Sequence, residues 1–535
     1  MMKVIIVGGV AGGATAATRI KRLNEDAEIV IFERCRFVSY ANCGLPYYIG
    51  EQILDKNALT LQTPTSLYKR YKIIVKVSHE VLDVDPINKK VIVKNLITGD
   101  IFEEKYDKLL LSPGAKPIKL SFLDNKKNVF ELRTVEDTYK IKDFIDNTKP
   151  KTAAIIGGGF VGLEVAENLV NLGINVTIIE KSNHVLNNID SDIASFVHHH
   201  IRSKGVKLLL NTDASKMDLD FDLILVSVGV TPDNSLAVKA GLELGYNGSI
   251  KVNDKMETSI KDIYAVGDAV EVTHKVLDEK RVIILAAPAN KEARVAASNI
   301  CGLDSSYQGT LSSNILKVFD LTVASVGINE KEATLNGYNW EKVILSPANH
   351  ATYYPNASIM TLKVIYDRKT QKILGAQAVG YDGVDKRIDV IATAIYAGLK
   401  APVLKDLDLT YAPPYSSAKD PVNMAGFIID NIENGVVKQF SYDDISSLEN
   451  MDVTLLDTRT VKEYNLGFAE GFINIPLDEL RDNLSLLDKT KKVYVMCHSG
   501  MRSYLASRIL IQNGFDAYNF IGGFKLYHSI NTDKN

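Results

Sequence analysis

The sequence predicts an α/β protein of several domains, in which two βαβ units precede a mixed α+β segment and a compact α/β segment. Three observations predict it. The 535 residues exceed what one hydrophobic core usually organises. Strand-like apolar runs alternate with helical patterns through roughly the first 270 residues. Two glycine loops each follow a strand-like run and open a helical one. A hydrophobic content of 46% with 24% charged residues excludes a largely disordered or fibrous chain.

Charge and hydropathy exclude two classes of partner. The 62 Lys and Arg residues against 65 Asp and Glu residues give a formal net charge of −3. No long basic run is present, so a nucleic acid or a membrane surface has no electrostatic support as a partner. No apolar run approaches the ~20 residues that a membrane-spanning helix needs.

The cysteine content argues against a disulfide scaffold. Cys35, Cys43, Cys301 and Cys497 are scattered and form no CxxC or zinc-type spacing. This predicts a reducing compartment, the cytoplasm, in which an important cysteine works alone. The N-terminal residues resemble a signal peptide only superficially. A buried strand over residues 3–7, followed by a glycine turn and a helix, explains them better.

The predicted elements follow in a regular order. Residues 3–33 are typical of a strand, a glycine loop, a helix and a strand, and a second such unit starts near residue 151. Between them, residues 109–117 predict a strand that leaves one domain for the other. Residues 262–272 predict a returning strand that stops at the start of a helix. From about 320 to 430 the pattern is mixed α+β, and the last ~95 residues have strands and a glycine loop of their own.

The second glycine loop is the stronger nucleotide-binding motif. Residues 157–162, GGGFVG, match GxGxxG between a strand and a helix, where glycines allow a tight turn and close approach of the backbone to a pyrophosphate. Glu180 ends the next strand, where its carboxylate can accept hydrogen bonds from a ribose and repel a 2′-phosphate. NADH is thus favoured over NADPH, although the neighbouring Lys181 leaves that choice open. The predicted contacts are Gly157, Gly159, Phe160, Val161, Gly162 and Glu180.

The first glycine loop departs from the motif. Residues 8–13, GGVAGG, have Val10 where the middle glycine is expected, but Glu33 again ends the next strand. Asp268, after Gly267 at the end of a strand, can reach a flavin ribityl or phosphate group. Two dinucleotide loops in one chain predict two Rossmann-like domains that hold FAD and a nicotinamide nucleotide, with hydride passing between them.

Cys43 lies in the segment SYANCGLPYY, which places it beside the first glycine loop. It is predicted to open a helix, and a helix N-terminus lowers the pKa of a thiol. The thiolate is the form that attacks disulfides and persulfides. On spacing alone, a small buried apolar residue is an equal alternative. Cys35 and Cys301 have no comparable setting and are predicted to be structural.

With these motifs, the chain resembles the single-cysteine branch of the flavin disulfide reductases. That branch contains coenzyme A disulfide reductases, NADH oxidases and peroxidases, and NADH-dependent persulfide or polysulfide reductases. The resemblance implies an FAD-binding domain (1–115 and 246–322), an NAD(P)H-binding domain (116–245) and a dimerisation domain (323–435). Because no second cysteine stands near Cys43, its redox partner must be a bound thiol or an oxidised sulfur. The implied FAD contacts are Gly8, Ala11, Gly12, Glu33, Arg34, Val81, Ser112, Gly114, Asp268 and Pro288.

The resemblance also implies a coenzyme A site and a homodimer. Arg19 and Arg22 lie one turn apart on the first helix, where two guanidinium groups suit the phosphates of coenzyme A; a solvated basic face is the alternative. Tyr71 stands where a lysine is expected. Tyr353 and Tyr411 match a catalytic pair that reaches the redox cysteine of the other subunit. The implied coenzyme A contacts are Thr15, Arg19, Arg22, Ser39, Asn42, Arg70, Asn299 and Lys419.

Residues 441–535 resemble a rhodanese domain, through LLDTRTVKEYNLGFAEGFINIPLDEL, VYVMCHSGMRSYLASRIL and GFDAYNFIGGF. Cys497 ends a strand and is followed by a helix, so successive backbone N–H groups form a cradle for a thiolate or a persulfide. Four residues separate Cys497 from Arg502, one fewer than in cysteine phosphatases of related fold, which favours sulfur transfer. Catalytic roles are implied for both residues.

The run of three histidines, 198–200, is not predicted to bind a metal. Consecutive helical residues point about 100° apart and cannot chelate one ion. The run is expected on the surface, and no metal is predicted.

Together these features predict an FAD-dependent NAD(P)H oxidoreductase. It would reduce coenzyme A persulfide, polysulfide or coenzyme A disulfide at Cys43, while Cys497 handles sulfane sulfur. The fusion of a reductase to a rhodanese domain favours coenzyme A persulfide over coenzyme A disulfide as the substrate, because a disulfide reductase has no need of a sulfurtransferase. One alternative is an NADH oxidase or peroxidase that cycles Cys43 through a sulfenic acid. Another is a sulfur-carrier or redox-sensing protein with little turnover.

Overall fold

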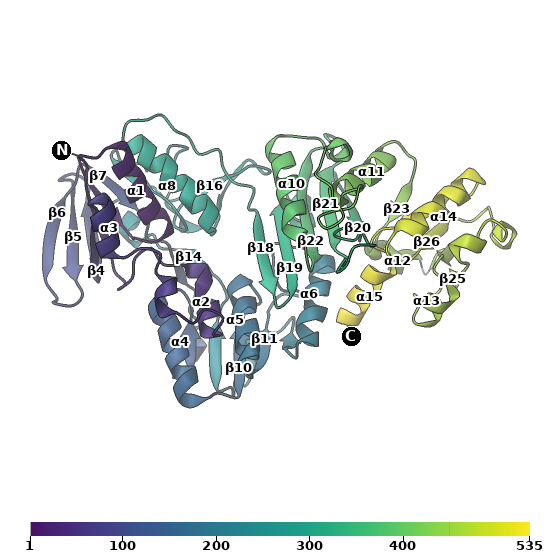
Figure 1. Cartoon of the computed structure of the whole chain (residues 1–535), viewed down its shortest axis with the longest axis horizontal. Coiled ribbons are helices and arrows are strands. Elements are labelled where there is room, and N and C mark those ends of the chain that lie inside the picture. The colour runs from purple at the N-terminus through teal and green to yellow at the C-terminus, as the bar shows by residue number, and fades with distance from the viewer. Residues whose placement is uncertain (1, 449, 535) are drawn as a thin grey trace. The chain divides into compact units, whose positions relative to one another are not determined.

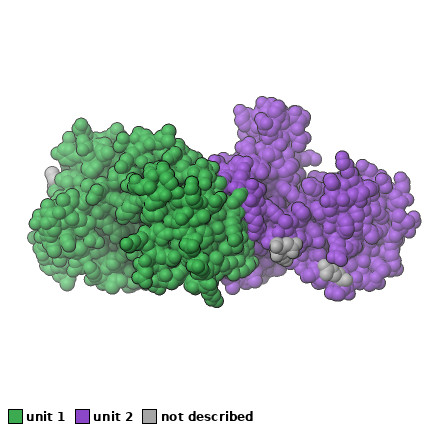
Figure 2. All heavy atoms as spheres, turned by 90° about the horizontal axis from the view of Figure 1, so that it is seen from below, with its two compact units in different colours: residues 1–185, 205–312 green, residues 186–204, 313–535 purple. Residues whose placement is uncertain are grey.

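The computed structural model describes residues 2–448 and 450–534 (Figure 1). The chain divides into two compact units, which Figure 2 colours separately. Unit 1 comprises residues 1–185 and 205–312, and unit 2 comprises residues 186–204 and 313–535. Residues 186–204, which lie within the predicted NAD(P)H-binding segment, thus pack with unit 2.

The first sheet of unit 1 is parallel, with the strand order β15-β7-β1-β2-β3. Its central strand β1 (Lys3–Val7) is buried, as predicted from the apolar run at the N-terminus. The loops after β1, β7 and β15 leave the sheet at the same carboxyl edge, where open α/β sheets bind their ligands. The other elements of this part are α1 (Ala11–Leu23), β2 (Glu28–Glu33), α2 (Leu45–Ile49), α3 (Pro64–Tyr71), β3 (Ile74–Val77), β7 (Lys108–Leu111), β15 (Ile263–Ala265) and α8 (Ala286–Ile300).

The second sheet of unit 1 repeats the plan, with the parallel order β12-β11-β10-β13-β9. The succession of strand, glycine loop, helix and strand recurs in β10, α5 and β11, which confirms the predicted duplication. The elements are β9 (Val129–Glu131), α4 (Val135–Thr148), β10 (Thr152–Ile156), α5 (Phe160–Asn171), β11 (Asn175–Ile179), β12 (Lys207–Leu209), β13 (Leu223–Val226) and α7 (Ser235–Lys239).

Small antiparallel sheets complete unit 1, and two of them correct the predicted layout. Residues 109–117 form two strands, β7 and β8, because Pro113 and Gly114 interrupt the run. After β15 the chain enters the hairpin β16-β17, so the helix predicted directly after residue 272 was wrong; α8 begins at Ala286. The strands are β4 (His79–Asp85), β5 (Lys90–Asn95), β6 (Ile101–Lys105), β8 (Ala115–Pro117), β14 (Val230–Pro232), β16 (Glu271–His274) and β17 (Glu279–Val282).

Unit 2 begins with an antiparallel sheet of order β18-β19-β22-β21-β20, the α+β segment predicted from the sequence. Strands β21 and β22 are buried on both faces, since helices α6 and α10 and other segments cover the sheet. The elements are α6 (Ser191–Ser203), β18 (Asn314–Val318), β19 (Leu321–Gly327), α9 (Glu330–Leu335), β20 (Trp340–Leu345), β21 (Thr361–Asp367), β22 (Ile373–Gly380), α10 (Val384–Tyr396) and α11 (Pro421–Glu433).

The C-terminal part of unit 2 has a parallel sheet of its own, in the order β23-β27-β26-β24-β25. Strand β26 is fully buried and ends directly before Cys497, as predicted. The elements are β23 (Lys438–Phe440), α12 (Tyr442–Leu448), β24 (Thr454–Asp457), α13 (Val461–Asn465), β25 (Ile473–Asn474), β26 (Val493–Met496), α14 (Met501–Gln512), β27 (Ala517–Phe520) and α15 (Gly523–Lys534).

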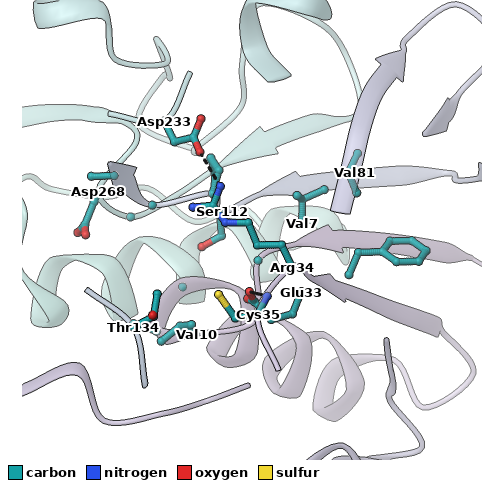
Figure 3. Close-up of a pocket in the computed structure, with 18 of the residues that line it drawn as sticks. Val7, Val10, Glu33, Arg34, Cys35, Val81, Ser112, Thr134, Asp233 and Asp268 are labelled. Carbon is teal, nitrogen blue, oxygen red and sulfur yellow. Dashed lines mark hydrogen bonds and ion pairs between the residues drawn. The ribbon is translucent and has the colours of Figure 1, made fainter. Parts of the chain in front are cut away.

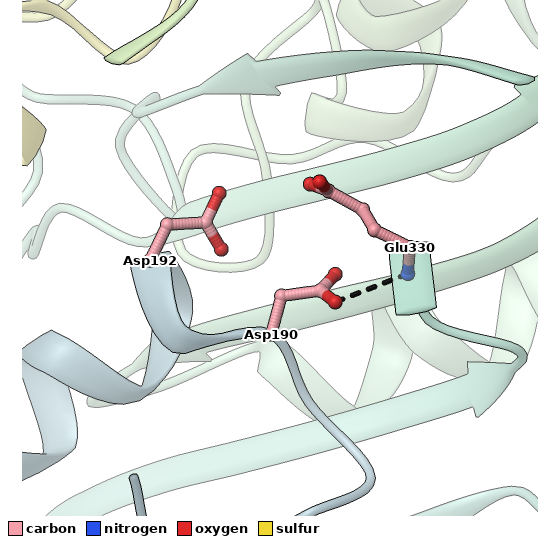
Figure 4. A group of neighbouring side chains, drawn as sticks. All are labelled: Asp190, Asp192 and Glu330. Carbon is pink, nitrogen blue, oxygen red and sulfur yellow. Dashed lines mark hydrogen bonds between the residues drawn. The ribbon is translucent and has the colours of Figure 1, made fainter. Parts of the chain in front are cut away.

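Three carboxylates gather where α6 begins (Figure 4). Asp190, Asp192 and Glu330 each place an oxygen atom within 4.8 Å of the others. The fully buried ammonium of Lys363 lies 2.8 Å from Asp190 and from Asp192, and it also contacts Glu330. Burial alone lowers the pKa of Lys363, but the three carboxylates raise it above its ordinary value. Because one ammonium already contacts all three carboxylates, we assign the cluster to ion pairing that anchors α6 and propose no metal there.

The histidine run lies inside the molecule, so the predicted surface position was wrong. Helix α6 packs against β22 and against α15, both far away in the sequence. The side chains of His198 and His200 are 0% and 9% exposed. The three rings have three different partners: Asp533 for His198, the carbonyl of Ser529 for His199 and Asp320 for His200. The prediction failed because the helix is covered on more than one face.

Candidate functional site

A cavity opens at the carboxyl edge of the first sheet (Figure 3). The loop after β1 supplies Gly8, the loop after β7 supplies Ser112, and the turn after β15 supplies Asp268. Pro288 alone among the predicted FAD contacts does not line the cavity, although its neighbour Ala289 does. The predicted FAD contacts in the lining are Gly8, Ala11, Gly12, Glu33, Arg34, Val81, Ser112, Gly114 and Asp268.

The two glycine loops share one pattern of hydrogen bonds. Glu33 accepts from Gly9 N (2.8 Å) and Cys35 N (2.9 Å), and Glu180 accepts from Gly158 N and Ser182 N (2.7 Å each). Each acid therefore ties its glycine loop to the end of the following strand. Burial raises the pKa of Glu33 above its ordinary value.

The first glycine of each loop has no room for a side chain. A Cβ atom on Gly8 would lie 2.1 Å from the carbonyl oxygen of Ser112, and one on Gly157 would lie 2.3 Å from that of Ser227. Both residues also have φ near +100° (+91° and +105°), a conformation that favours glycine. Only glycine therefore allows the tight turn with which each loop leaves its strand. Val10 at the middle position of the first loop does not disturb this arrangement.

The cavity also contains charged residues that the motifs did not reveal. Asp233 pairs with Arg34 at 3.5 Å (Figure 3). It also pairs with Lys116 at 2.8 Å, and Arg133 donates to Asp268. Arg133 directly precedes Thr134, which caps the N-terminus of α4 and forms a capping box with Asp137. That capping box is a sequence signal that could have placed Arg133 at the start of a helix.

Cys35 also lines the cavity (Figure 3). Burial and the neighbouring Glu33 raise the pKa of its thiol to about 12, so this cysteine is held as a thiol.

Cys43 is exposed and belongs to a 3-10 turn (Asn42–Gly44) directly before α2. Helix α2 packs against α5, the helix that follows the second glycine loop. Partial burial, and then the carboxylate of Glu164 on α5, raise the pKa of the Cys43 thiol. The predicted lowering of this pKa was wrong, because the thiol is partly buried, an acid faces it, and α2 begins two residues later.

The predicted coenzyme A contacts of unit 1 lie on several elements. Thr15 and Arg19 lie on α1, and Thr15 Oγ1 donates to Asn290 of α8 at 2.6 Å. The Nε atom of Arg19 is buried and has no partner within the described residues, whereas Arg22 is exposed. Asn299 is committed elsewhere, because its amide nitrogen donates to the carbonyls of Lys255 and Ser305. The remaining predicted contacts are placed as follows: Ser39 and Asn42 before α2, Arg70 exposed on α3, and Lys419 exposed in unit 2.

Unit 2 brings the two predicted tyrosines together. The hydroxyl oxygens of Tyr353 and Tyr411 lie 3.0 Å apart, and the two side chains are 76% and 48% exposed. The hydrogen bond to Tyr411 raises the pKa of Tyr353. Their loops meet at buried Arg387, which sequence reasoning missed. Its guanidinium donates to Asn349 O (2.8 Å), Ser416 Oγ (3.1 Å) and Asp420 Oδ2 (3.0 Å).

Cys497 is buried between β26 and α14, and its sulfur accepts two hydrogen bonds. Gly500 N donates from 3.1 Å and Ser503 Oγ from 3.2 Å. Donors aimed at a sulfur stabilise its anionic form. Gly500 has φ +101°, which turns its N–H toward the sulfur. The loop thus offers the sulfur one backbone N–H and one hydroxyl, where the sequence predicted successive backbone N–H groups.

Arg502 points to a neighbouring loop. Its two terminal nitrogens lie 2.6 and 2.7 Å from the carboxylate oxygens of Glu463 in α13. The bond to Arg502 lowers the pKa of Glu463 to about 2. Arg459 pairs with buried Asp457 and stacks 3.8 Å from the ring centre of Phe524. Both arginines therefore fix the loops around Cys497.

Family models match three consecutive parts of the chain. The pyridine nucleotide-disulphide oxidoreductase model matches residues 2–293, and the dimerisation domain of the same family matches residues 314–421. The chain belongs to the pyridine nucleotide-disulphide oxidoreductase family. A rhodanese-like domain model matches residues 443–530, so the predicted fold class is confirmed.

One curated relative matches 80% of the chain, and two solved structures match nearly all of it. A coenzyme A disulfide reductase of Staphylococcus haemolyticus is 39% identical over 439 residues, which cover 80% of this chain and 99% of the relative. The structure of reduced Bacillus anthracis CoADR-RHD is 44% identical with a TM-score of 0.97, over 99% of this chain and 98% of that one. A NAD-dependent persulfide reductase from A. fulgidus is 35% identical with a TM-score of 0.93, over 98% and 100% of the two chains.

Membership of this family makes FAD and a nicotinamide nucleotide the cofactors. The chain fits them, because both loops present glycine backbone that no side chain could replace, and acids end both following strands.

Within the described residues, no helix is long and apolar enough to span a membrane.

Replacing Glu180 by glutamine is expected to weaken the preference for NADH. The amide keeps one acceptor oxygen for the loop but removes the charge that repels a 2′-phosphate. The KM for NADPH should fall, and that for NADH should rise, each by about tenfold. Stopped-flow reduction of the bound flavin with each nucleotide measures this. Glu103→Gln is the control, because Glu103 is an exposed acid on β6, a strand of another sheet, where it pairs with Lys90. Unchanged discrimination in Glu180→Gln would contradict the assignment.

Replacing Glu164 by glutamine is expected to make Cys43 reactive at lower pH. Burial raises the pKa of Glu164 to about 7, so above neutral pH its ionised carboxylate opposes ionisation of the Cys43 thiol. Without that charge, the pH of half-maximal Cys43 alkylation should fall by about 0.5 to 1. Peptide-resolved mass spectrometry after iodoacetamide treatment measures it. Glu167→Gln is the matched control one turn away, and an equal shift in both variants would refute a specific role for Glu164.

Proposed function

We propose that this protein is an FAD-dependent, NADH-linked reductase of coenzyme A persulfide, polysulfide or coenzyme A disulfide. Cys43 would be its redox residue, and its rhodanese domain would handle sulfane sulfur at Cys497. One observation carries the proposal: a single chain holds an exposed thiol beside a dinucleotide cavity and a second thiol in a hydrogen-bonded anion cradle. The names of the relatives, coenzyme A disulfide reductase and persulfide reductase, support it.

Cys43 would act as the nucleophile. Its thiolate attacks the outer sulfur of the persulfide, a new S–S bond forms, and the bond to coenzyme A breaks with release of its thiolate, which takes up a proton. Two electrons that come from NADH then cleave the new bond, regenerate the Cys43 thiolate and release hydrosulfide. Bound FAD supplies the two-electron chemistry between nicotinamide and sulfur. With coenzyme A disulfide, the same attack yields a mixed disulfide and one coenzyme A thiolate.

The exposed tyrosine pair supports a homodimer as the working form. Tyr353 and Tyr411 lie on the part of the chain that matches a dimerisation domain, and their hydroxyls are open to a partner. We propose that they reach Cys43 of the partner subunit, where a phenol can protonate a leaving thiolate. Arg19 and Arg22 would hold the phosphates of coenzyme A.

Cys497 would take up sulfane sulfur from a donor. The thiolate attacks the donor's outer sulfur, and the bond from that sulfur to the rest of the donor breaks, so that thiosulfate would release sulfite. The persulfide that forms on Cys497 is stabilised by Gly500 N and Ser503 Oγ. Transfer to the thiol of coenzyme A then regenerates the Cys497 thiolate and yields the substrate of Cys43. A reducing compartment, the cytoplasm, fits four unpaired cysteines.

Anaerobic NADH oxidation by the flavin-loaded enzyme tests the proposal, with coenzyme A persulfide, polysulfide and coenzyme A disulfide in parallel. We expect turnover with the persulfide or the polysulfide to be fastest. With thiosulfate and coenzyme A as the only sulfur sources, we expect turnover that Cys497→Ala abolishes. NADH consumption that requires oxygen or peroxide and ignores coenzyme A would instead identify an oxidase or peroxidase.

A further inference from the structure

Helix α15 is built into the Cys497 loop at its first turn. Phe524 N donates to Cys497 O at 2.7 Å, and Lys525 N donates to His498 O at 3.0 Å. Gly523 has φ +67°, and a Cβ on it would lie 2.6 Å from the carbonyl atoms of His498. Two backbone amides of α15 thus bind the carbonyl groups of Cys497 and His498. These hydrogen bonds fix the orientation of the first two peptide groups of the loop that surrounds the sulfur of Cys497.

The other end of α15 is held by α6 through matched polar side chains. Ser195 Oγ lies 2.8 Å from Ser529 Oγ, and His199 Nε2 lies 3.0 Å from Ser529 O. His198 Nδ1 lies 2.6 Å from Asp533 Oδ2, and Arg202 pairs with the same carboxylate. The side chains of Ser195, His198 and Ser529 are at most 4% exposed. An apolar cluster of Phe196, Ile344, Ile521, Leu526 and Ile530 completes this contact, which we call the α6–α15 seam.

Polar partners buried in this way fix one relative position of the two helices. A buried hydroxyl or imidazole that loses its hydrogen-bond partner raises the free energy of the folded protein. A shift of α15 along α6 would break several of these hydrogen bonds, whereas a purely apolar contact would lose less stability from the same shift. The 12 residues of α15 span about 18 Å as a helix. A helix of this length moves as one body, so the seam sets where its first turn lies.

We infer that α6 positions the persulfide cradle, with Ser195 and His198 as positioning residues that act on Cys497 through α15. The inference rests on the proposed sulfur transfer at Cys497. It makes sulfur transfer depend on a helix outside the rhodanese domain, which a free-standing rhodanese would not have.

The test uses the full-length, flavin-loaded protein carrying Ser195→Arg or His198→Gln. We expect kcat for sulfur transfer from thiosulfate to cyanide to fall about tenfold, because Gly500 N and Ser503 Oγ no longer aim at the sulfur. The pH dependence of Cys497 alkylation should change as well, and amide hydrogen exchange in residues 523–534 should accelerate. Reduction of the flavin by NADH should stay within about twofold of the unsubstituted protein. Ser203→Ala and Thr532→Ala are the controls, since both residues are exposed on the same two helices.

Two results would overturn the inference. One is faster exchange in α15 with unchanged sulfur transfer and alkylation; the other is unchanged exchange in both variants. If Ser195→Arg also removes the protection of the β26 amides against exchange, the substitution has unfolded the rhodanese domain. The milder variant His198→Gln then tests the inference. Absence of sulfur transfer in the unsubstituted protein would refute the proposed function instead, so the two failures are distinguishable.

Discussion

Cys43→Ser is expected to abolish NADH-driven reduction of persulfide, polysulfide and coenzyme A disulfide, with a loss of at least about 1,000-fold in kcat. A serine hydroxyl is not ionised at neutral pH and cannot form the S–S bond on which the reaction depends. NADH should still reduce the bound flavin at its normal rate, because the second glycine loop and Glu180 lie on other elements. Single-turnover absorbance of the flavin and steady-state NADH consumption separate the two steps.

The matched control for this prediction is Cys301→Ser. Cys301 is half-buried, and burial raises the pKa of its thiol, so it should remain protonated and inert. We expect normal turnover from this variant. Full reductase activity in Cys43→Ser would remove Cys43 from the mechanism, and a loss of flavin reduction would show that the substitution disturbed the cofactor rather than the chemistry at sulfur.

The parts of the fold that local patterns encode were predictable. The strand at residues 3–7, both glycine loops and the strand that ends before Cys497 each depend on a few consecutive residues, and all lie where the sequence placed them. Nine of the ten FAD contacts that the family resemblance implies line the cavity. Most of them lie in or beside the glycine loop and the strand ends of the first parallel sheet, whereas Val81 lies within the antiparallel strand β4.

The parts that failed depend on partners remote in the sequence. The histidine run was misplaced because Asp533 and Ser529 lie more than 300 residues away. The pKa of Cys43 was predicted with the wrong sign because the folded chain partly buries the thiol and brings Glu164 of α5 close to it. Arg133 and Asp233 escaped notice for a similar reason: each is a single charged residue in a loop, and only the folded chain brings it to the cavity.

Arg387→Met is expected to destabilise unit 2 by about 3 to 5 kcal/mol, the usual effect of leaving a buried charge without its partner. Arg387 is 1% exposed, and Asp420, which it contacts at 3.0 Å, is equally buried. After the substitution, Asp420 keeps the hydroxyl of Ser416 and the backbone N–H of Val422 at hydrogen-bond distance. Urea unfolding followed by hydrogen exchange in β21 and β22 would measure the loss.

Lys386→Met is the matched control, because the adjacent Lys386 lies 3.7 Å from the same carboxylate but is partly exposed, so its loss should cost less than about 1 kcal/mol.

The consequence for function follows from the residues that the Arg387 side chain contacts. It joins Asn349, four residues before Tyr353, to Ser416, five residues after Tyr411, so it holds the two loops in the register that pairs the phenols. In protein that remains folded, Arg387→Met should therefore lower reductase kcat by about tenfold while flavin reduction by NADH is unchanged. Normal turnover would mean that the tyrosine pair does not depend on this arginine, or that the pair does not serve the chemistry at Cys43.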